Sequence, residues 1–163
     1  MIQRIQSVYL FLSGIACLLL LYFPFYKISV LTDTTNMFDI QINLWGINMI
    51  GAESNVAVVV VLTIIISILT IVTGMLSLFT IANYSRRELQ MKLCKINFLL
   101  ITGLLACMVW YLDDATKILC MEQCEKDVAL GMFLPALAII FTFLANKGIK
   151  KDHDMIKAAD RIR

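Results

Sequence analysis

Four long apolar blocks constrain this chain more than any other feature of its sequence. They cover about residues 5–26, 56–82, 93–112 and 128–146, and apart from Lys95 near the start of the third block they carry no Asp, Glu, Lys, Arg or His. Each is close to the roughly 20 residues that a helix needs to cross a hydrocarbon layer about 30 Å thick. A charge in mid-membrane costs at least about 2.5 kcal/mol, and lipid cannot satisfy backbone polar groups. The pattern therefore predicts an all-α membrane protein with a bundle of four transmembrane helices.

The composition agrees with membrane burial. Hydrophobic residues make up 60% of the 163 residues and charged residues 16%, against about 45–50% and about 25% in soluble domains. A chain of this length is expected to form a single membrane domain, residues 1–163. The first block resembles a signal peptide, but its bulky exit from Tyr22 to Tyr26 is unlike the small-residue cleavage site of such peptides. We therefore expect the first helix to be retained.

Basic residues are distributed unevenly among the segments that flank the blocks. Of the 14 Lys and Arg residues, the connecting segments 27–55 and 113–127 contain only Lys27, Lys117 and Lys126. The others lie before the first block, between the second block and the start of the third, where Lys95 is included, and after the fourth. Because loops rich in Lys and Arg face the cytoplasm, the sequence predicts cytoplasmic N- and C-termini. The two remaining segments, which are acidic, are expected to face outward.

The basic side, which includes the tail 147–163, has two interpretations. The favoured one is contact with anionic lipid headgroups. The other is a docking site for a cytoplasmic partner or a nucleic acid, but the charges are scattered and lack interleaved aromatic residues. The expected partners are therefore the lipid bilayer and either another membrane protein or a second copy of the chain, and no nucleic acid.

The first outer segment, residues 27–55, alternates apolar and polar residues on either side of the turn-forming run Thr32 to Asn36. The apolar positions are Ile28, Val30, Phe38, Ile40, Ile42 and Leu44. Period-two alternation around a turn predicts a β-hairpin, here a small extracytoplasmic cap on the bundle. Trp45 follows directly and is expected to anchor the chain at the headgroup interface. A ligand-binding lid is the alternative interpretation of this segment.

The second outer segment, residues 113–127, contains Cys120 and Cys124. Thiols outside the cytoplasm can be oxidised, so the pair is a candidate disulfide or the redox pair of a thiol–disulfide membrane oxidoreductase. Its spacing differs from C-x-x-C, and the remaining cysteines lie within the apolar blocks, where they are not positioned to relay electrons to it. No outward-facing His joins the pair, so no metal site is expected there.

Small and hydroxyl residues recur along the second block at alternating spacings of four and three: Thr63, Ser67, Thr70, Gly74 and Ser77. This spacing is that of a contact line between two helices, and small residues let helix backbones approach closely. We interpret the row as a helix-packing seam. The alternative is the lining of a small-molecule carrier or channel, although the interiors of the blocks hold no acid or base that would carry protons.

Both ends of the chain resemble those of a known family. The resemblance is carried by the start, Met1-Ile2-Gln3-Arg4-Ile5-Gln6, and by the close, Ala145-Asn146-Lys147 through Ile149-Lys150-Lys151-Asp152 to Asp160-Arg161-Ile162-Arg163. The family is the bacterial domain of unknown function 4293, and the resemblance implies a small four-span inner-membrane protein with no assigned activity. The order of a helix, a β-rich outer loop with a Trp and three further helices is also similar in outline to claudin-type tetraspan proteins, although their first-loop cysteine pair is lacking.

Sequence motifs for catalysis are lacking: there is no phosphate loop, no G-x-G-x-x-G, no G-x-S-x-G and no H-E-x-x-H. We therefore predict a non-enzymatic membrane protein that acts through protein or lipid contacts. No catalytic, cofactor-binding or metal-binding residues and no cofactor are expected. A thiol–disulfide oxidoreductase using Cys120 and Cys124, and a small-molecule carrier or channel, are the alternatives.

Overall fold

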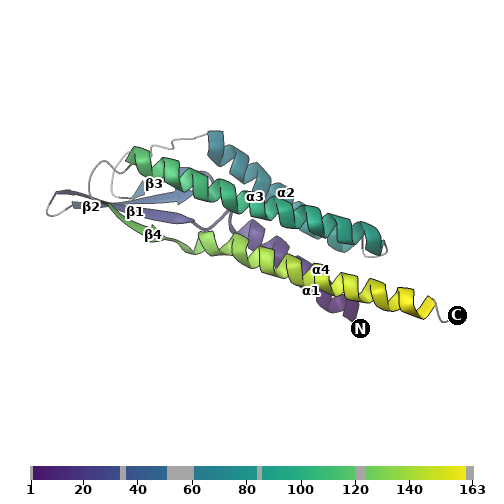
Figure 1. Cartoon of the computed structure of the whole chain (residues 1–163). Helices are drawn as coiled ribbons and strands as arrows, with labels where there is room; N and C mark the ends of the chain where they lie inside the picture. The colour runs from purple at the N-terminus through teal and green to yellow at the C-terminus, as the bar shows by residue number, and fades with distance from the viewer. Residues whose placement is uncertain (1, 34–35, 51–60, 84–85, 120–123, 161–163) are drawn as a thin grey trace.

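The computed structural model describes residues 2–33, 36–50, 61–83, 86–119 and 124–160 of the chain. Its elements, in chain order, are α1 (Ile2–Leu19), β1 (Tyr26–Asp33), β2 (Asn36–Asn43), β3 (Gly46–Ile50), α2 (Val61–Ala82), α3 (Arg87–Leu119), β4 (Cys124–Val128), the short 3-10 helix η1 (Leu130–Met132) and α4 (Phe133–Asp160). The helices run lengthwise beside one another, the strands gather at one end of them, and both termini lie toward the other end (Figure 1). α1 and α3 each contact both α2 and α4. The fold is therefore a helix bundle with a sheet at one end.

Three helices in the described part of the chain are long and apolar enough to cross a membrane: Thr63–Ala82, Arg87–Asp113 and Leu130–Ala158. These helices support an integral, multi-pass membrane protein. The first helix is apolar over Ile5–Leu19 only, a length of about 22 Å. The prediction of four long spans is thus confirmed in part, because α1 is shorter than the predicted span 5–26.

The early end of α1 has a local cause. Pro24 disfavours the helical conformation at the residue before it, and the chain turns after Leu19 before it reaches Pro24. The backbone N–H of Phe25 then donates to the carbonyl of Ile42 at 3.1 Å. The last residues of the predicted span therefore lead into the sheet, and Tyr26 is the first residue of β1.

The predicted hairpin is confirmed, but it belongs to a larger sheet. β1 and β2 pair antiparallel, with Ile28 opposite Ile40 and Tyr26 opposite Ile42. The full sheet has four strands in the order β3-β2-β1-β4, and all neighbouring pairs are antiparallel. β3 follows the hairpin, whereas β4 comes from the segment 113–127, which we expected to be a loop. That expectation was wrong because the edge strand β4 is mostly charged and shows no apolar alternation.

The inner face of the sheet packs onto the end of the bundle. Ile28, Ile40 and Ile42 are buried in one cluster with Leu20, which directly follows α1, and Met108 of α3. These strand residues occupy the alternating positions that the sequence marked as apolar. The sheet and the adjoining end of the helices therefore share one hydrophobic core.

The last two helices extend beyond the predicted spans. α3 continues to Leu119, so the expected outer loop 113–127 consists largely of the end of α3 and of β4. α4 begins at Phe133 and continues to Asp160, so the tail from Lys147 prolongs the same helix. The α4 extension contains four Lys and two Ala, which are good helix formers and favour continuation of this helix past the apolar block. This extension brings the tail of α4 alongside the start of α3.

Candidate functional site

The predicted seam residues of α2 lie largely in the interior of the bundle. Thr63, Thr70, Gly74 and Ser77 are buried, and Ser67 is half-buried. A Cβ added to Gly74 would lie 3.2 Å from Leu18 Cδ2 of α1. On the facing helix, a Cβ added to Gly14 would lie 3.3 Å from Ser77 Cβ. The small residues of α1 and α2 therefore coincide with a close approach of these helices.

Hydroxyl groups of α2 bond mainly to carbonyls within the protein. Thr70 Oγ1 donates to the carbonyl of Ile66 at 2.7 Å, one turn earlier. Ser67 Oγ lies 2.7 Å from the carbonyl of Thr63 and 2.8 Å from that of Leu44, directly after β2. Ser67 thus connects α2 with the sheet. The hydroxyl groups of Ser67 and Thr70 therefore pair with backbone carbonyls of the protein itself.

Two hydrogen bonds between helices were missed by the sequence analysis. Asn97 Nδ2 of α3 donates to Ser77 Oγ of α2 at 2.6 Å, and Ser13 Oγ of α1 shares a hydrogen bond of 2.8 Å with Thr142 Oγ1 of α4. All of these side chains are fully buried. Of these four residues the sequence analysis singled out only Ser77, because Ser13, Asn97 and Thr142 belong to no periodic pattern.

Trp45 is 69% exposed and lies between the sheet and the end of α1. Its Nε1 donates to the carbonyl of Leu21 at 2.8 Å. That carbonyl lies in the turn that follows α1, two residues beyond Leu19, so the indole connects the end of β2 with this turn. The role of Trp45 as an interfacial anchor stays a prediction from the sequence.

The candidate redox pair lies outside what the structure describes. Cys120 is not among the described residues, and Cys124 is the first residue of β4, with only its backbone described. Disulfide formation between them stays a prediction from the sequence. Among the described residues, no group of at least three His, Cys, Asp or Glu side chains is placed to hold a metal ion.

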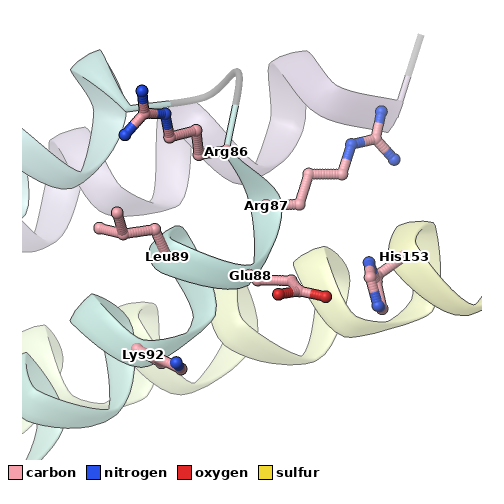
Figure 2. A pocket seen from close by; sticks show the side chains of 6 residues that line it. All are labelled: Arg86, Arg87, Glu88, Leu89, Lys92 and His153. Carbon is pink, nitrogen blue, oxygen red and sulfur yellow. The ribbon is translucent and has the colours of Figure 1, made fainter.

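A pocket with basic side chains lies where the start of α3 meets the tail of α4. This basic pocket has a volume of about 520 Å³ and is lined by Arg86, Arg87, Glu88, Leu89, Lys92 and His153 (Figure 2). Four of the lining residues come from the start of α3, Arg86 directly precedes that helix, and only His153 comes from α4. Pockets of about 300–1,000 Å³ are of the size that holds small ligands or ligand groups.

Arg87 joins the two sides of the basic pocket. Its Nη1 lies 3.6 Å from Asp152 Oδ2 and donates to the Asp152 carbonyl at 3.4 Å. Both side chains are mostly covered, with 26% and 14% exposure. Figure 2 shows Arg87 and Glu88 extending toward the side on which His153 lies, whereas Arg86 extends to the opposite side. The ion pair therefore holds the start of α3 against α4.

Arg86 and Lys92 give the basic pocket its spare positive charge. Both side chains are exposed, and neither has an ion-pair partner within the described ranges. Glu88 is the one acidic residue in the lining. The first turn of α3 adds partial positive charge from its backbone N–H groups. The arrangement is suited to holding an anion rather than a cation.

The sequence identified the basic residues of this end but not the pocket that they form. Arg86, Arg87 and Lys92 were recognised as part of the basic side. His153 and Asp152 join them only because α4 continues as helix through the tail. Residues this far apart in the chain lie together because α3 packs against α4.

A second pocket lies at the sheet end of the molecule. It has a volume of about 420 Å³ and is lined by Phe23, Pro24, Lys27, Asp127, Val128, Ala129 and Leu130. Lys27 and Asp127 lie opposite each other on β1 and β4, so opposite charges offset each other here. Burial, and then the negative charge of Asp127, raises the pKa of the neighbouring Tyr26 phenol, which keeps it neutral. The mixed lining gives this pocket less charge selectivity than the basic pocket.

Comparison with known proteins identifies the family. A search of the curated proteins found no match. The family model described as Domain of unknown function (DUF4293) matches residues 2–162, nearly the full length of the chain. The resemblance seen at the two ends of the sequence is thereby confirmed, and the chain belongs to the DUF4293 family.

Proposed function

We propose that this protein is a non-enzymatic integral protein of the bacterial inner membrane and that it works through contacts made at the cytoplasmic end of its bundle. The contact site is the basic pocket, and its ligand is an anionic group of a lipid or protein. The observation that supports this function is the position of Arg86 and Lys92, exposed on the pocket wall without an acidic partner in the described ranges.

The placement of this end on the cytoplasmic side rests on charge. The basic pocket, the N-terminal start of α1 and the basic tail of α4 all lie at the end opposite the sheet (Figure 1). Lys and Arg concentrate on the cytoplasmic side of inner-membrane proteins. With this orientation the sheet and the acidic segments lie outside the membrane, away from the basic pocket.

Photo-crosslinking in living cells tests the proposal. Leu89, which lines the basic pocket, is replaced by benzoylphenylalanine, and the adducts formed on illumination are identified by mass spectrometry. We expect a reproducible adduct whose yield falls severalfold when Arg86→Gln and Lys92→Gln are combined, since two attractive charges are then missing.

The matched control combines Lys95→Gln with Lys147→Gln. These residues are exposed on the same helices near the same end but do not line the basic pocket. The control removes the same charge and is expected to leave the adduct unchanged. Absence of any adduct, or an equal loss with both pairs of substitutions, would count against the basic pocket as the contact site.

A further inference from the structure

We propose that the anionic group in the basic pocket is the phosphate of an anionic phospholipid from the leaflet that surrounds this end of the bundle. The inference rests on the proposed function and deepens it, because it commits the pocket to a lipid rather than to a soluble anion or a protein. Three observations support it: the position of the pocket along the helices, the chemistry of its lining, and an apolar residue beside the charged ones.

The position of the pocket relative to the bilayer follows from where the apolar helix surfaces end. The uncharged span of α2 ends at Ala82, and the pocket begins only a few residues later, at Arg86. On α3, apolar side chains are already exposed at Ile96 and Leu99, by 52% and 69%. At about 1.5 Å per residue, the stretch between Arg87 and Lys92 is about 8 Å long, which is comparable to the headgroup layer on one side of a bilayer. The pocket therefore lies at the level of lipid headgroups.

The lining matches the chemistry of a phosphate diester. The guanidinium of Arg86 can bind two phosphate oxygens at once, and the ammonium of Lys92 supplies a second positive charge. Arg87 is already engaged with Asp152, so it fixes the wall of the pocket instead of competing for the ligand. Glu88 repels anions from its own side, and the phosphate is therefore expected nearer to Arg86 and Lys92.

Leu89 gives the pocket an apolar side. It is one of the lining residues and its side chain is 36% exposed. An apolar group beside basic ones suits a lipid, whose glycerol and acyl chains follow directly after the phosphate. A free inorganic anion gains no binding energy from an apolar surface. The membrane also supplies lipid at this depth continuously, whereas a soluble anion reaches the site only from the cytoplasm.

Lipid retention measured by native mass spectrometry tests the inference. The protein is reconstituted in nanodiscs that contain phosphatidylglycerol and phosphatidylcholine, released into detergent, and the bound lipids are counted. We expect preferential retention of phosphatidylglycerol. Because Arg86 and Lys92 would hold the phosphate directly through hydrogen bonds between charged groups, the combined Arg86→Gln and Lys92→Gln substitutions should lower the retention of phosphatidylglycerol by about tenfold or more. The Lys95→Gln and Lys147→Gln control should keep most of it.

A second arm separates the two sources of phosphate. Inorganic phosphate is added to the protein in pure phosphatidylcholine nanodiscs and then, as a competitor, to the mixed nanodiscs. We expect no binding in the first case and no displacement in the second. Displacement of phosphatidylglycerol by free phosphate, or equal retention of phosphatidylglycerol by the pocket variant and the native chain, would overturn the lipid assignment.

The two proposals fail in different ways. Suppose that Leu89 crosslinks to a protein and that this adduct depends on Arg86 and Lys92, whereas lipid retention does not. The lipid assignment is then wrong, and the basic pocket remains the contact site. If neither the crosslink nor lipid retention depends on Arg86 and Lys92, both proposals fall. Proper folding of each variant is checked by its thermal unfolding in detergent before either assay.

Discussion

Asn97 illustrates how much a single buried side chain can contribute to the packing of this bundle. Its Nδ2 donates to Ser77 Oγ at 2.6 Å, while its Oδ1 has no hydrogen-bond partner among the described residues. A buried polar atom that loses its partner costs about 1–3 kcal/mol. The hydrogen bond between α2 and α3 therefore matters mainly because Asn97 would otherwise be entirely unsatisfied.

The dependence of the Asn97 amide on Ser77 predicts that the effects of substitutions at these two residues on the free energy of unfolding are not additive. Ser77→Ala leaves both polar atoms of the Asn97 amide unpaired and should lower the free energy of unfolding by about 1–2 kcal/mol. Adding Asn97→Leu removes the stranded amide, so this second substitution should be less harmful in the Ser77→Ala background than in the native chain. The expected coupling is about 0.6–1.7 kcal/mol, measured by unfolding in mixed detergent micelles.

The control for this cycle is Thr102→Ala, since Thr102 is exposed on α3 and donates to the carbonyl of Phe98 in its own helix. Thr102→Ala should show no coupling to Asn97→Leu. Purely additive effects of Ser77→Ala and Asn97→Leu would contradict the importance of the bond between the helices.

At the scale of single residues, a structural role could be predicted from the sequence where the residue belongs to, or adjoins, a repeating pattern. The row from Thr63 to Ser77 was recognisable because it recurs at helical spacing, and Trp45 was recognisable because it follows an alternating run. Asn97 and Ser13 belong to no repeat. Their partners lie on other helices, so their importance depends on packing that a local pattern does not encode.

At the scale of elements, the entry into α4 lies very close to the segment that leads from α1 into β1. The backbone N–H of Gly131, in η1, donates to the carbonyl of Pro24 at 3.0 Å, and that of Ala129 donates to the carbonyl of Phe25 at 3.3 Å. A Cβ added to Gly131 would lie 2.6 Å from Pro24 O and 2.9 Å from Phe25 Cα. Because these are backbone atoms, they cannot move aside as a flexible side chain would.

Gly131→Ala should therefore destabilise the protein strongly. Forcing the start of α4 away from the end of α1 is expected to cost about 1–3 kcal/mol or more, which would appear as a lower midpoint of thermal unfolding in detergent. Gly103→Ala is the matched control, because a Cβ at Gly103 meets no atom within 4 Å. Equal midpoints for the two variants would mean that the close approach at Gly131 is unimportant.

The elements also show where sequence reasoning stops. The alternation in β2 was recognisable because its apolar residues recur on a period of two, and α2, α3 and α4 were recognisable because each contains a long apolar run. β4 was missed since its residues Cys124 to Val128 are mostly charged, and its pairing with β1 depends on chain folded much earlier. The shortened α1 was missed because an apolar run does not reveal that its last residues join a sheet.

At the scale of the whole molecule, orientation is the property with the clearest test. Both termini lie at the end that carries the basic pocket (Figure 1). A fluorescent protein of the kind that matures only in the cytoplasm, fused after Arg163, should be bright, and alkaline phosphatase fused at the same place should be inactive. A dark fluorescent fusion together with an active phosphatase would invert the topology and place the basic pocket outside.

The basic pocket shows what the whole molecule adds to a sequence pattern. The positive-inside bias was visible as soon as the basic residues were located, and it placed Arg86 and Lys92 on one side of the membrane. That they form a pocket with His153 was not predictable from the sequence, because the tail of α4 had first to continue as helix and then to pack beside α3.

The pairing of β4 with β1 also has a consequence for biosynthesis. β1 is made near the start of the chain, but β4 follows only after α2 and α3. About 90 residues separate the two strands, and synthesis proceeds at about 5–20 residues per second. The edge of β1 that pairs with β4 therefore stays unpaired for several seconds before β4 is made. During that interval the incomplete sheet presents the unpaired backbone groups of β1 to its surroundings. In the proposed orientation, a chain stalled or cut before β4 would expose this strand edge outside the membrane, where proteases and chaperones can act on it.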